Sequence, residues 1–261
     1  MPGREETSRV LVTGGTGFLG FRVVAALLEA GANVSVMVRP GQEEKLQALG
    51  DRIQLNYADV WNKASLKGRA RGHSTIVHLV GSTRAEPERG LTYQQINLVS
   101  ARNVTSMAVS DGVPRMILLS AVIRPLSLSG EYIRSKREAE EYLQNSGLNW
   151  TIVRAPSLFA PNTRNFGLQA FAFFGALFPF NLFSTRMLPL PVDIAARGIA
   201  QLALKPETHE DRIIYARQLR QLAKGSRAAR QRRPLIQPQQ RYDADPEGLD
   251  EPPFGWLPPH S

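Results

Sequence analysis

Short runs of apolar, often β-branched residues alternate along this chain with stretches whose apolar residues recur every three or four positions. The short runs predict strands at Val10–Thr13, Val34–Val38, Ile53–Leu55, Thr75–Val80, Arg115–Leu119 and Trp150–Val153. The periodic stretches predict helices at Phe18–Ala30, Leu91–Ser110, Tyr132–Asn145 and Val192–Ala203. Because the strands are apolar throughout, we expect an α/β fold: a doubly wound parallel sheet of seven or so strands, covered by helices on both faces.

The pattern changes after Pro156 and predicts three regions. Residues 1–156 form the α/β domain, 157–222 a small C-terminal lobe, and 223–261 a disordered tail of low apolar content. Seven of the eleven Phe residues lie in one stretch of the lobe, Phe166–Phe183. Two interpretations of this Phe-rich stretch stay open: a helix that packs the lobe, or an apolar wall for a hydrophobic substrate or membrane surface.

Composition excludes several classes of protein. Without Cys, the chain has no disulfide scaffold, no thiolate-bound metal and no Cys nucleophile. The four His residues are spread out, so we expect no metal site. Lys and Arg exceed Asp and Glu by 32 to 23, but they are scattered along the body of the chain, so no nucleic-acid partner is expected. No apolar stretch is long enough for a membrane span, and the first residues do not resemble a targeting peptide, so we expect a cytoplasmic location.

A glycine-rich loop follows the first predicted strand and opens the first helix. It consists of Gly14, Gly15, Thr16, Gly17, Phe18, Leu19 and Gly20. Glycines in this strand–turn–helix context permit a tight turn and a close approach to a pyrophosphate, which the helix N-terminus then binds. The loop predicts a dinucleotide site, with a structural turn as the alternative.

Two further positions bear on which nucleotide binds. Arg39 ends the second predicted strand, nineteen residues after Gly20, where an acidic residue would favour NAD. An Arg there favours the 2′-phosphate of NADP(H), with NAD(H) still possible and a solvated Arg as the alternative. Asp59, next to Val60 after the third strand, is placed to accept from the adenine amino group, unless it merely caps a helix.

Tyr132 and Lys136 are four residues apart and therefore share one face of a predicted helix. An ammonium stabilises a nearby phenolate, so such a Tyr can give or take a proton while a nicotinamide transfers hydride. Tyr and Lys at this spacing are common in proteins, but in a chain that also has a predicted dinucleotide loop the pair indicates a catalytic site.

These motifs, together with Thr151–Pro156, resemble the short-chain dehydrogenase/reductase superfamily in its extended or atypical branch. The segment Gly130–Glu140 is similar to the members related to the NADPH-binding accessory subunit of respiratory complex I and to a ubiquinone-biosynthesis protein. The resemblance covers residues 8–215. It implies that residues 1–156 are a Rossmann-type dinucleotide-binding domain and that the small lobe, residues 157–222, holds substrate.

The resemblance implies roles for single residues. Tyr132 would be the general acid/base and Lys136 its helper, Ser120 the hydroxyl that orients a substrate carbonyl, and Asn97 a support of the site. Val80, Gly81 and the backbone at Pro156 would contact the cofactor. Only eleven residues separate Ser120 from Tyr132, so Ser127 and Ser129 stay alternatives for the hydroxyl.

The family resemblance leaves three functions open. The first is an NADP-dependent oxidoreductase acting on an apolar carbonyl or alcohol. The second is a non-catalytic NADP(H)-binding accessory protein of a respiratory-chain or quinone-biosynthesis complex, in the mitochondrial matrix or at the inner-membrane surface. The third is a redox-sensing regulator.

Overall fold

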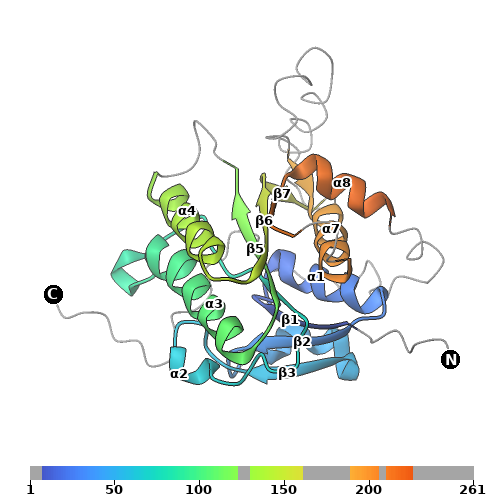
Figure 1. Cartoon of the computed structure of the whole chain (residues 1–261), viewed down its shortest axis with the longest axis horizontal. Coiled ribbons are helices and arrows are strands. Elements are labelled where there is room, and N and C mark those ends of the chain that lie inside the picture. Colours follow the sequence, from blue (N-terminus) through green and yellow to red (C-terminus); the bar gives the residue numbers. More distant parts are fainter. Residues whose placement is uncertain (1–7, 123–129, 161–188, 206–209, 226–261) are drawn as a thin grey trace, which may run out of the picture.

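The computed structural model describes residues 8–122, 130–160, 189–205 and 210–225 (Figure 1). The strands are β1 Arg9–Thr13, β2 Asn33–Val38, β3 Ile53–Tyr57, β4 Thr75–His78, β5 Arg115–Ala121, β6 Asn149–Ala155, β7 Leu158–Phe159, β8 Leu190–Pro191 and β9 Arg212–Ile214. The α-helices are α1 Phe18–Glu29, α2 Lys63–Leu66, α3 Ser100–Asp111, α4 Gly130–Gln144, α7 Val192–Leu204 and α8 Ala216–Gly225. Two 3₁₀ segments, Glu43–Arg52 and Pro87–Arg89, and a π-helical segment, Gln94–Val99, complete the assignment.

Seven strands form one sheet in the order β3-β2-β1-β4-β5-β6-β9, and every neighbouring pair is parallel. The predicted doubly wound parallel sheet is therefore confirmed. The strand order reverses between β1 and β4, and in such sheets ligands bind beyond the carboxyl ends of the strands at this reversal.

The two faces of the sheet carry separate hydrophobic cores. Along β1, Val10 and Val12 belong to one core and Leu11 to the other, because successive side chains of a strand point to opposite faces. Helices α1, α7 and α8 cover the first face, and α3 and α4 cover the second (Figure 1). With both faces buried, the strands are apolar throughout, which is the pattern that the sequence displayed.

Two features of the fold were not predicted from the sequence. The seventh strand, β9, has only three residues, and the main-chain N–H of Asp211 just before it donates to Trp150 O on β6, at 2.7 Å. The helix expected at Leu91–Ser110 instead contains the π-helical segment before α3. A periodic pattern does not distinguish a π turn from an α turn over so few residues.

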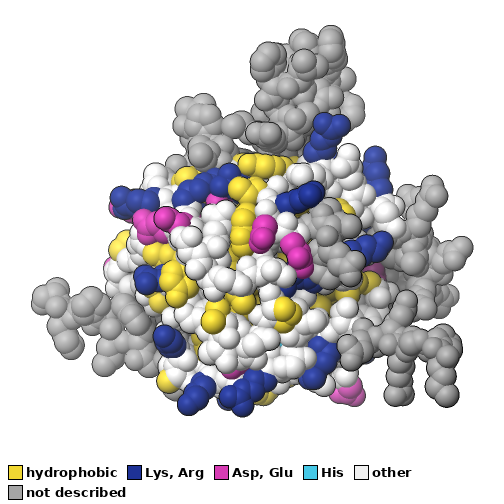
Figure 2. Space-filling model, viewed as in Figure 1, with side chains coloured by type: hydrophobic (Ala, Val, Ile, Leu, Met, Phe, Trp, Pro, Cys, Tyr) yellow, Lys and Arg dark blue, Asp and Glu magenta, His cyan; other side chains and the backbone are white. Residues whose placement is uncertain are grey.

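The residues described after Pro156 pack on the main sheet, through α7 on one face and β9 at the edge. The boundary at residue 156 stays a prediction, since the Phe-rich stretch lies outside the described residues. The same holds for Ser127, Ser129 and nearly all of the expected tail. Within the described ranges, no helix is long and apolar enough to cross a membrane. Figure 2 shows Lys and Arg side chains spread over the visible face of the described part.

Candidate functional site

The glycine-rich loop connects β1 to α1 and is shaped by close backbone contacts. Gly14 has a φ of 75°, and a Cβ atom there would lie 2.9 Å from Val80 N. A Cβ on Gly20 would overlap the carbonyl oxygen of Gly14. Gly17, the N-cap of α1, supplies no side chain to accept from the first turn, and no acidic residue lies in that turn. This helix N-terminus therefore fits a bound anion such as a pyrophosphate.

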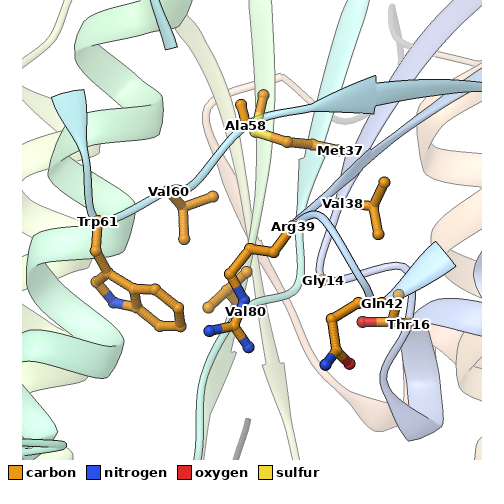
Figure 3. A pocket seen from close by; sticks show the side chains of 10 residues that line it. All are labelled: Gly14, Thr16, Met37, Val38, Arg39, Gln42, Ala58, Val60, Trp61 and Val80. Carbon is orange, nitrogen blue, oxygen red and sulfur yellow. The ribbon is translucent and has the colours of Figure 1, made fainter. Parts of the chain in front are cut away.

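A pocket lies beside the loop, between the carboxyl ends of β2 and β3; we call it the β2–β3 pocket (Figure 3). Its lining combines five of the predicted site residues with five others: Gly14, Thr16, Arg39, Val60 and Val80, and Met37, Val38, Gln42, Ala58 and Trp61. Arg39 extends into the pocket, and its Cζ lies 5.1 Å from the centroid of the Trp61 ring. The structure thus brings the loop and Arg39 to one cavity, as expected of a nucleotide site.

Asp59 lies next to this pocket and is buried. Its Oδ1 accepts from the main-chain N–H of Trp61 at 3.0 Å, whereas its Oδ2 is buried without a hydrogen-bond partner. Burial raises the pKa of Asp59, against the opposing effects of the Trp61 N–H and the Arg39 charge. The N-cap of helix α2 is Asn62, whose side chain accepts from Ala64 N, so Asp59 does not cap that helix. Its contact with adenine stays a prediction, and the unpartnered oxygen fits it.

Lys136 and Asn97 both lie against Gly81, and Asn97 is hydrogen-bonded to Ser135. Tyr132 lies one turn before Lys136 on α4, and its ring centroid is 5.7 Å from that of Tyr93, edge to face. We call Tyr132, Lys136, Gly81, Asn97 and Ser135 the α4 cluster. Tyr132 and Lys136 are 6% and 4% exposed. A Cβ on Gly81 would lie 2.5 Å from Lys136 Nζ and 2.8 Å from Asn97 Oδ1, so backbone fills the space between these side chains. Gly81 directly follows Val80 of the β2–β3 pocket, which places the α4 cluster beside it.

Hydrogen bonds hold Asn97 in the α4 cluster. Its Nδ2 donates to Ser135 Oγ at 3.3 Å, and its Oδ1 accepts from Ser82 N at 3.3 Å. Ser135 Oγ in turn donates to Tyr132 O at 2.8 Å. Asn97 lies in the π-helical segment, a distortion often found at functional sites.

Lys136 is a buried cation with little compensation. Its Nζ donates to Leu119 O at 3.2 Å. Burial lowers the pKa of Lys136 to about 8, although the negative charge of Glu140 acts in the opposite direction. Nearby His78 is fully buried and hydrogen-bonded to Thr13 Oγ1 at 2.7 Å, and its pKa is lowered to about 3 by burial first and by Lys136 second. His78 is therefore neutral near pH 7, so it adds no second positive charge beside Lys136.

Ser120 takes part in a different set of contacts, which we call the Glu140 network. The Ser120 hydroxyl donates to Glu140 Oε1 and accepts from Arg137 Nη1 at 3.2 Å. Glu140, 3% exposed, also accepts from Arg137 and from Arg154, whose Nη2 lies 2.6 Å from Oε2. Arg154 reaches Tyr215 OH at 3.2 Å, which ties β6 to the chain after β9. The hydroxyl of Ser120 thus points into the protein, and its role toward a substrate stays a prediction.

The sequence profile of a family described as NAD(P)H-binding matches residues 14–171. The chain belongs to this NAD(P)H-binding family. The resemblance to atypical short-chain dehydrogenases/reductases is thereby confirmed, and so is the class of cofactor, a nicotinamide dinucleotide.

Relatives at 26–27% identity match this chain over only part of their own length. Over 198 residues the chain is 27% identical to a ceramide reductase of Caulobacter vibrioides, a match that covers 76% of this chain and 61% of the relative. It is 26% identical to subunit 9 of the NADH dehydrogenase [ubiquinone] 1 alpha subcomplex, mitochondrial, of Rattus norvegicus, over 78% and 56% of the two chains. The matches thus span less than two thirds of either relative.

Solved structures of this NAD(P)H-binding fold superpose on the chain at low identity. An NADPH-dependent quinone oxidoreductase of Escherichia coli gives a TM-score of 0.57 at 21% identity, over 79% of this chain and 68% of the other. A UDP-glucuronic acid 4-epimerase of Bacillus cereus gives 0.58 at 18% identity, over 79% and 77%. These likenesses support the fold alone.

Sequence reasoning did not single out several residues of the candidate site and its surroundings. Trp61 directly follows Val60, and Gln42 lies three residues after Arg39. The position of both residues just after a predicted strand, next to residues already assigned to the site, was the signal that could have identified them. The spacing of Arg137 and Glu140 on α4 is a local signal for an ion pair, but the partners Ser120 on β5 and Arg154 on β6 are distant in the sequence. Leu19 is buried in the core beneath the loop, and Pro156 is buried after β6; contacts of either with a nucleotide stay predictions.

Proposed function

We propose that this protein is an NADP(H)-dependent oxidoreductase acting on an apolar carbonyl or alcohol. The observation that carries the proposal is the α4 cluster: Tyr132 and Lys136 are both buried one turn apart on α4, and the Lys136 ammonium lies against Gly81, directly after Val80 of the β2–β3 pocket. A bound nicotinamide would supply or accept the hydride. Tyr132 would give the carbonyl oxygen a proton, or take one from the alcohol.

Lys136 would hold the ribose hydroxyls next to Gly81 and stabilise the phenolate of Tyr132. Asn97 keeps α4 in place through Ser135, whose hydroxyl is bonded to the carbonyl of Tyr132. The burial of both side chains excludes water from the proton transfer.

The preference for NADP(H) rests on the charge in the β2–β3 pocket. Arg39 brings a guanidinium into this pocket, where a 2′-phosphate would accept its N–H groups. An apolar substrate is supported by the name of one relative, a ceramide reductase, and by the Phe-rich stretch of the sequence.

The first experiment identifies the nucleotide. Small molecules released from the purified full chain are analysed by mass spectrometry, and calorimetry then measures the affinities for NADPH and NADH. We expect NADPH to bind more tightly. Absence of heat with both nucleotides, from folded protein, would sink the proposal.

The second experiment tests turnover. NADPH oxidation is followed with a panel of long-chain ketones, ceramide-type ketones and quinones. Tyr132→Phe should lower kcat at least about a hundredfold, since general acid–base catalysis contributes roughly 10²–10⁴-fold, and should leave the NADPH affinity within about twofold. Tyr142→Phe, on the same helix but bonded to Ser106, is the matched control and should keep its activity.

An accessory role in a large complex is the second candidate, favoured by the similarity to the rat NADH dehydrogenase subunit. It requires bound nucleotide without turnover and co-purification with a large assembly. In that case Tyr132→Phe would change neither assembly nor nucleotide affinity.

A further inference from the structure

Trp61 forms one wall of the β2–β3 pocket and is held from two sides. Its indole Nε1–H donates to Gln95 O at 2.9 Å, in the π-helical segment. Its main-chain N–H donates to Asp59 Oδ1 at 3.0 Å. Just before it, Val60 O accepts from Asn103 Nδ2 of α3 at 3.0 Å. The indole is therefore a fixed surface within the pocket.

Arg39 extends from the end of β2 toward this surface. Figure 3 shows its guanidinium between Trp61 and Gln42, and the distance from Cζ to the indole centroid is 5.1 Å. The guanidinium also acts on the Asp59 carboxylate, whose pKa it lowers against the effect of burial. An aromatic face and a buried carboxylate thus both attract the same cation into the pocket.

We propose that Trp61 is a specificity-determining residue: its indole holds the guanidinium of Arg39 ready for the 2′-phosphate of NADP(H). This inference rests on the proposed function. A guanidinium stacks through its flat face, whereas its N–H donors lie in its plane. The contact with Trp61 does not use those donors, and it removes part of the rotamer entropy that Arg39 would lose on binding.

The same distance argues against the main alternative, an adenine base stacked between Arg39 and Trp61. A base between them would need about 7 Å, two van der Waals contacts of roughly 3.5 Å each. The two side chains are closer than that. The alternatives also differ in their consequences, because adenine is common to NADP(H) and NAD(H), whereas the 2′-phosphate is not.

The test compares affinities for NADPH and NADH, by calorimetry, in the full chain and in Trp61→Leu and Trp61→Phe. Trp61→Leu should weaken NADPH about threefold to fivefold, the equivalent of a partly exposed cation–π contact, and change NADH by less than about 1.5-fold. Trp61→Phe keeps an aromatic face and should recover much of the NADPH affinity. Trp150→Leu removes an indole that does not line the pocket and should leave the ratio unchanged.

Substitutions of Arg39 give a second test of the inference, which can be carried out even if Trp61→Leu folds poorly. Arg39→Lys keeps the charge but not the planar stack, and should lose the NADPH preference about as far as Trp61→Leu does. In an Arg39→Ala background, Trp61→Phe and Trp61→Leu should have no further effect on NADPH, because coupled residues are not additive.

The outcomes separate the inference from the proposed function. Equal losses for both nucleotides, an unchanged ratio in Trp61→Leu, or additive effects with Arg39→Ala would overturn the inference alone. If the unmodified chain binds neither nucleotide, or binds NADH as tightly as NADPH, the proposed preference fails first.

Discussion

The two ends of the candidate site are built in different ways. At the β2–β3 pocket, main-chain atoms of the glycine-rich loop shape the site, and Gly14, Gly15 and Gly20 leave no room for a side chain. At the α4 cluster, the site depends on buried polar side chains, Tyr132, Lys136 and Asn97, with the buried Glu140 two turns along the same helix. The β2–β3 pocket depends on positions without a side chain, whereas the α4 cluster depends on a hydrogen-bond or charge partner for each buried polar group.

This difference decides how each end responds to substitution. Added atoms at the loop collide with backbone that cannot rotate away, so binding and packing fail together. A change of charge at Glu140 leaves its partly buried partners without compensation, which destabilises the fold without a direct effect on the nucleotide. The following substitutions test this contrast, beginning with the largest expected effect.

Gly20→Ala should break the loop. Its methyl group would overlap the Gly14 carbonyl, so α1 must shift away from β1. We expect NADPH affinity to fall more than about a hundredfold, the equivalent of nearly 3 kcal/mol, measured by calorimetry. Gly130→Ala is the matched control, because nothing lies within 4 Å of its added Cβ. Retained affinity in Gly20→Ala would contradict the steric account.

Glu140→Gln should destabilise the α4 side without a direct effect on the nucleotide. Arg137 and Arg154 would lose the charge that they share, and a broken buried ion pair costs about 3 kcal/mol of unfolding free energy when its cations partly reach water. Denaturant unfolding measures the loss. The exposed neighbour provides the comparison: Glu141→Gln should stay within about 0.5 kcal/mol of the unmodified protein.

Lys136 should make stability depend on pH in the nucleotide-free protein. Its folded pKa, about 8, lies below the ordinary 10.5, so between these values the unfolded chain binds more protons than the folded one. Stability relative to Lys136→Met should therefore rise from pH 8 to 10.5, by on the order of 2 kcal/mol. If the unfolding free energies of the two proteins changed equally with pH over this window, the burial of the Lys136 cation would be contradicted.

Ser120→Ala should have the smallest effect and separates two roles for this hydroxyl. If it serves the Glu140 network, unfolding free energy falls by about 1 kcal/mol, the usual value of one hydrogen bond, and NADPH affinity is unchanged. The paired measurement is turnover with any substrate found in the panel. A large loss of kcat with intact stability would restore the substrate-orienting role that the family resemblance implies.

Much of the fold followed from local patterns. The six predicted strands and the helices beginning near Phe18, Tyr132 and Val192 are all present, because the period of apolar residues depends on neighbours in the chain. Strand β9 was not located, because three residues carry too little pattern. Its place in the sheet is decided by pairing with β6, about sixty residues earlier.

The candidate site likewise has features that local spacing predicts and features that depend on contacts between distant segments. The sequence by itself determined the glycine-rich loop at the end of β1 and the shared face of Tyr132 and Lys136, since both depend on spacing within one or two turns. Only the tertiary structure decided that Ser120 turns to Glu140 and that Arg39 lies over Trp61. Such partners are chosen by the donors, acceptors and rings that the packed strands bring within a few ångströms, and spacing along the chain does not encode that competition.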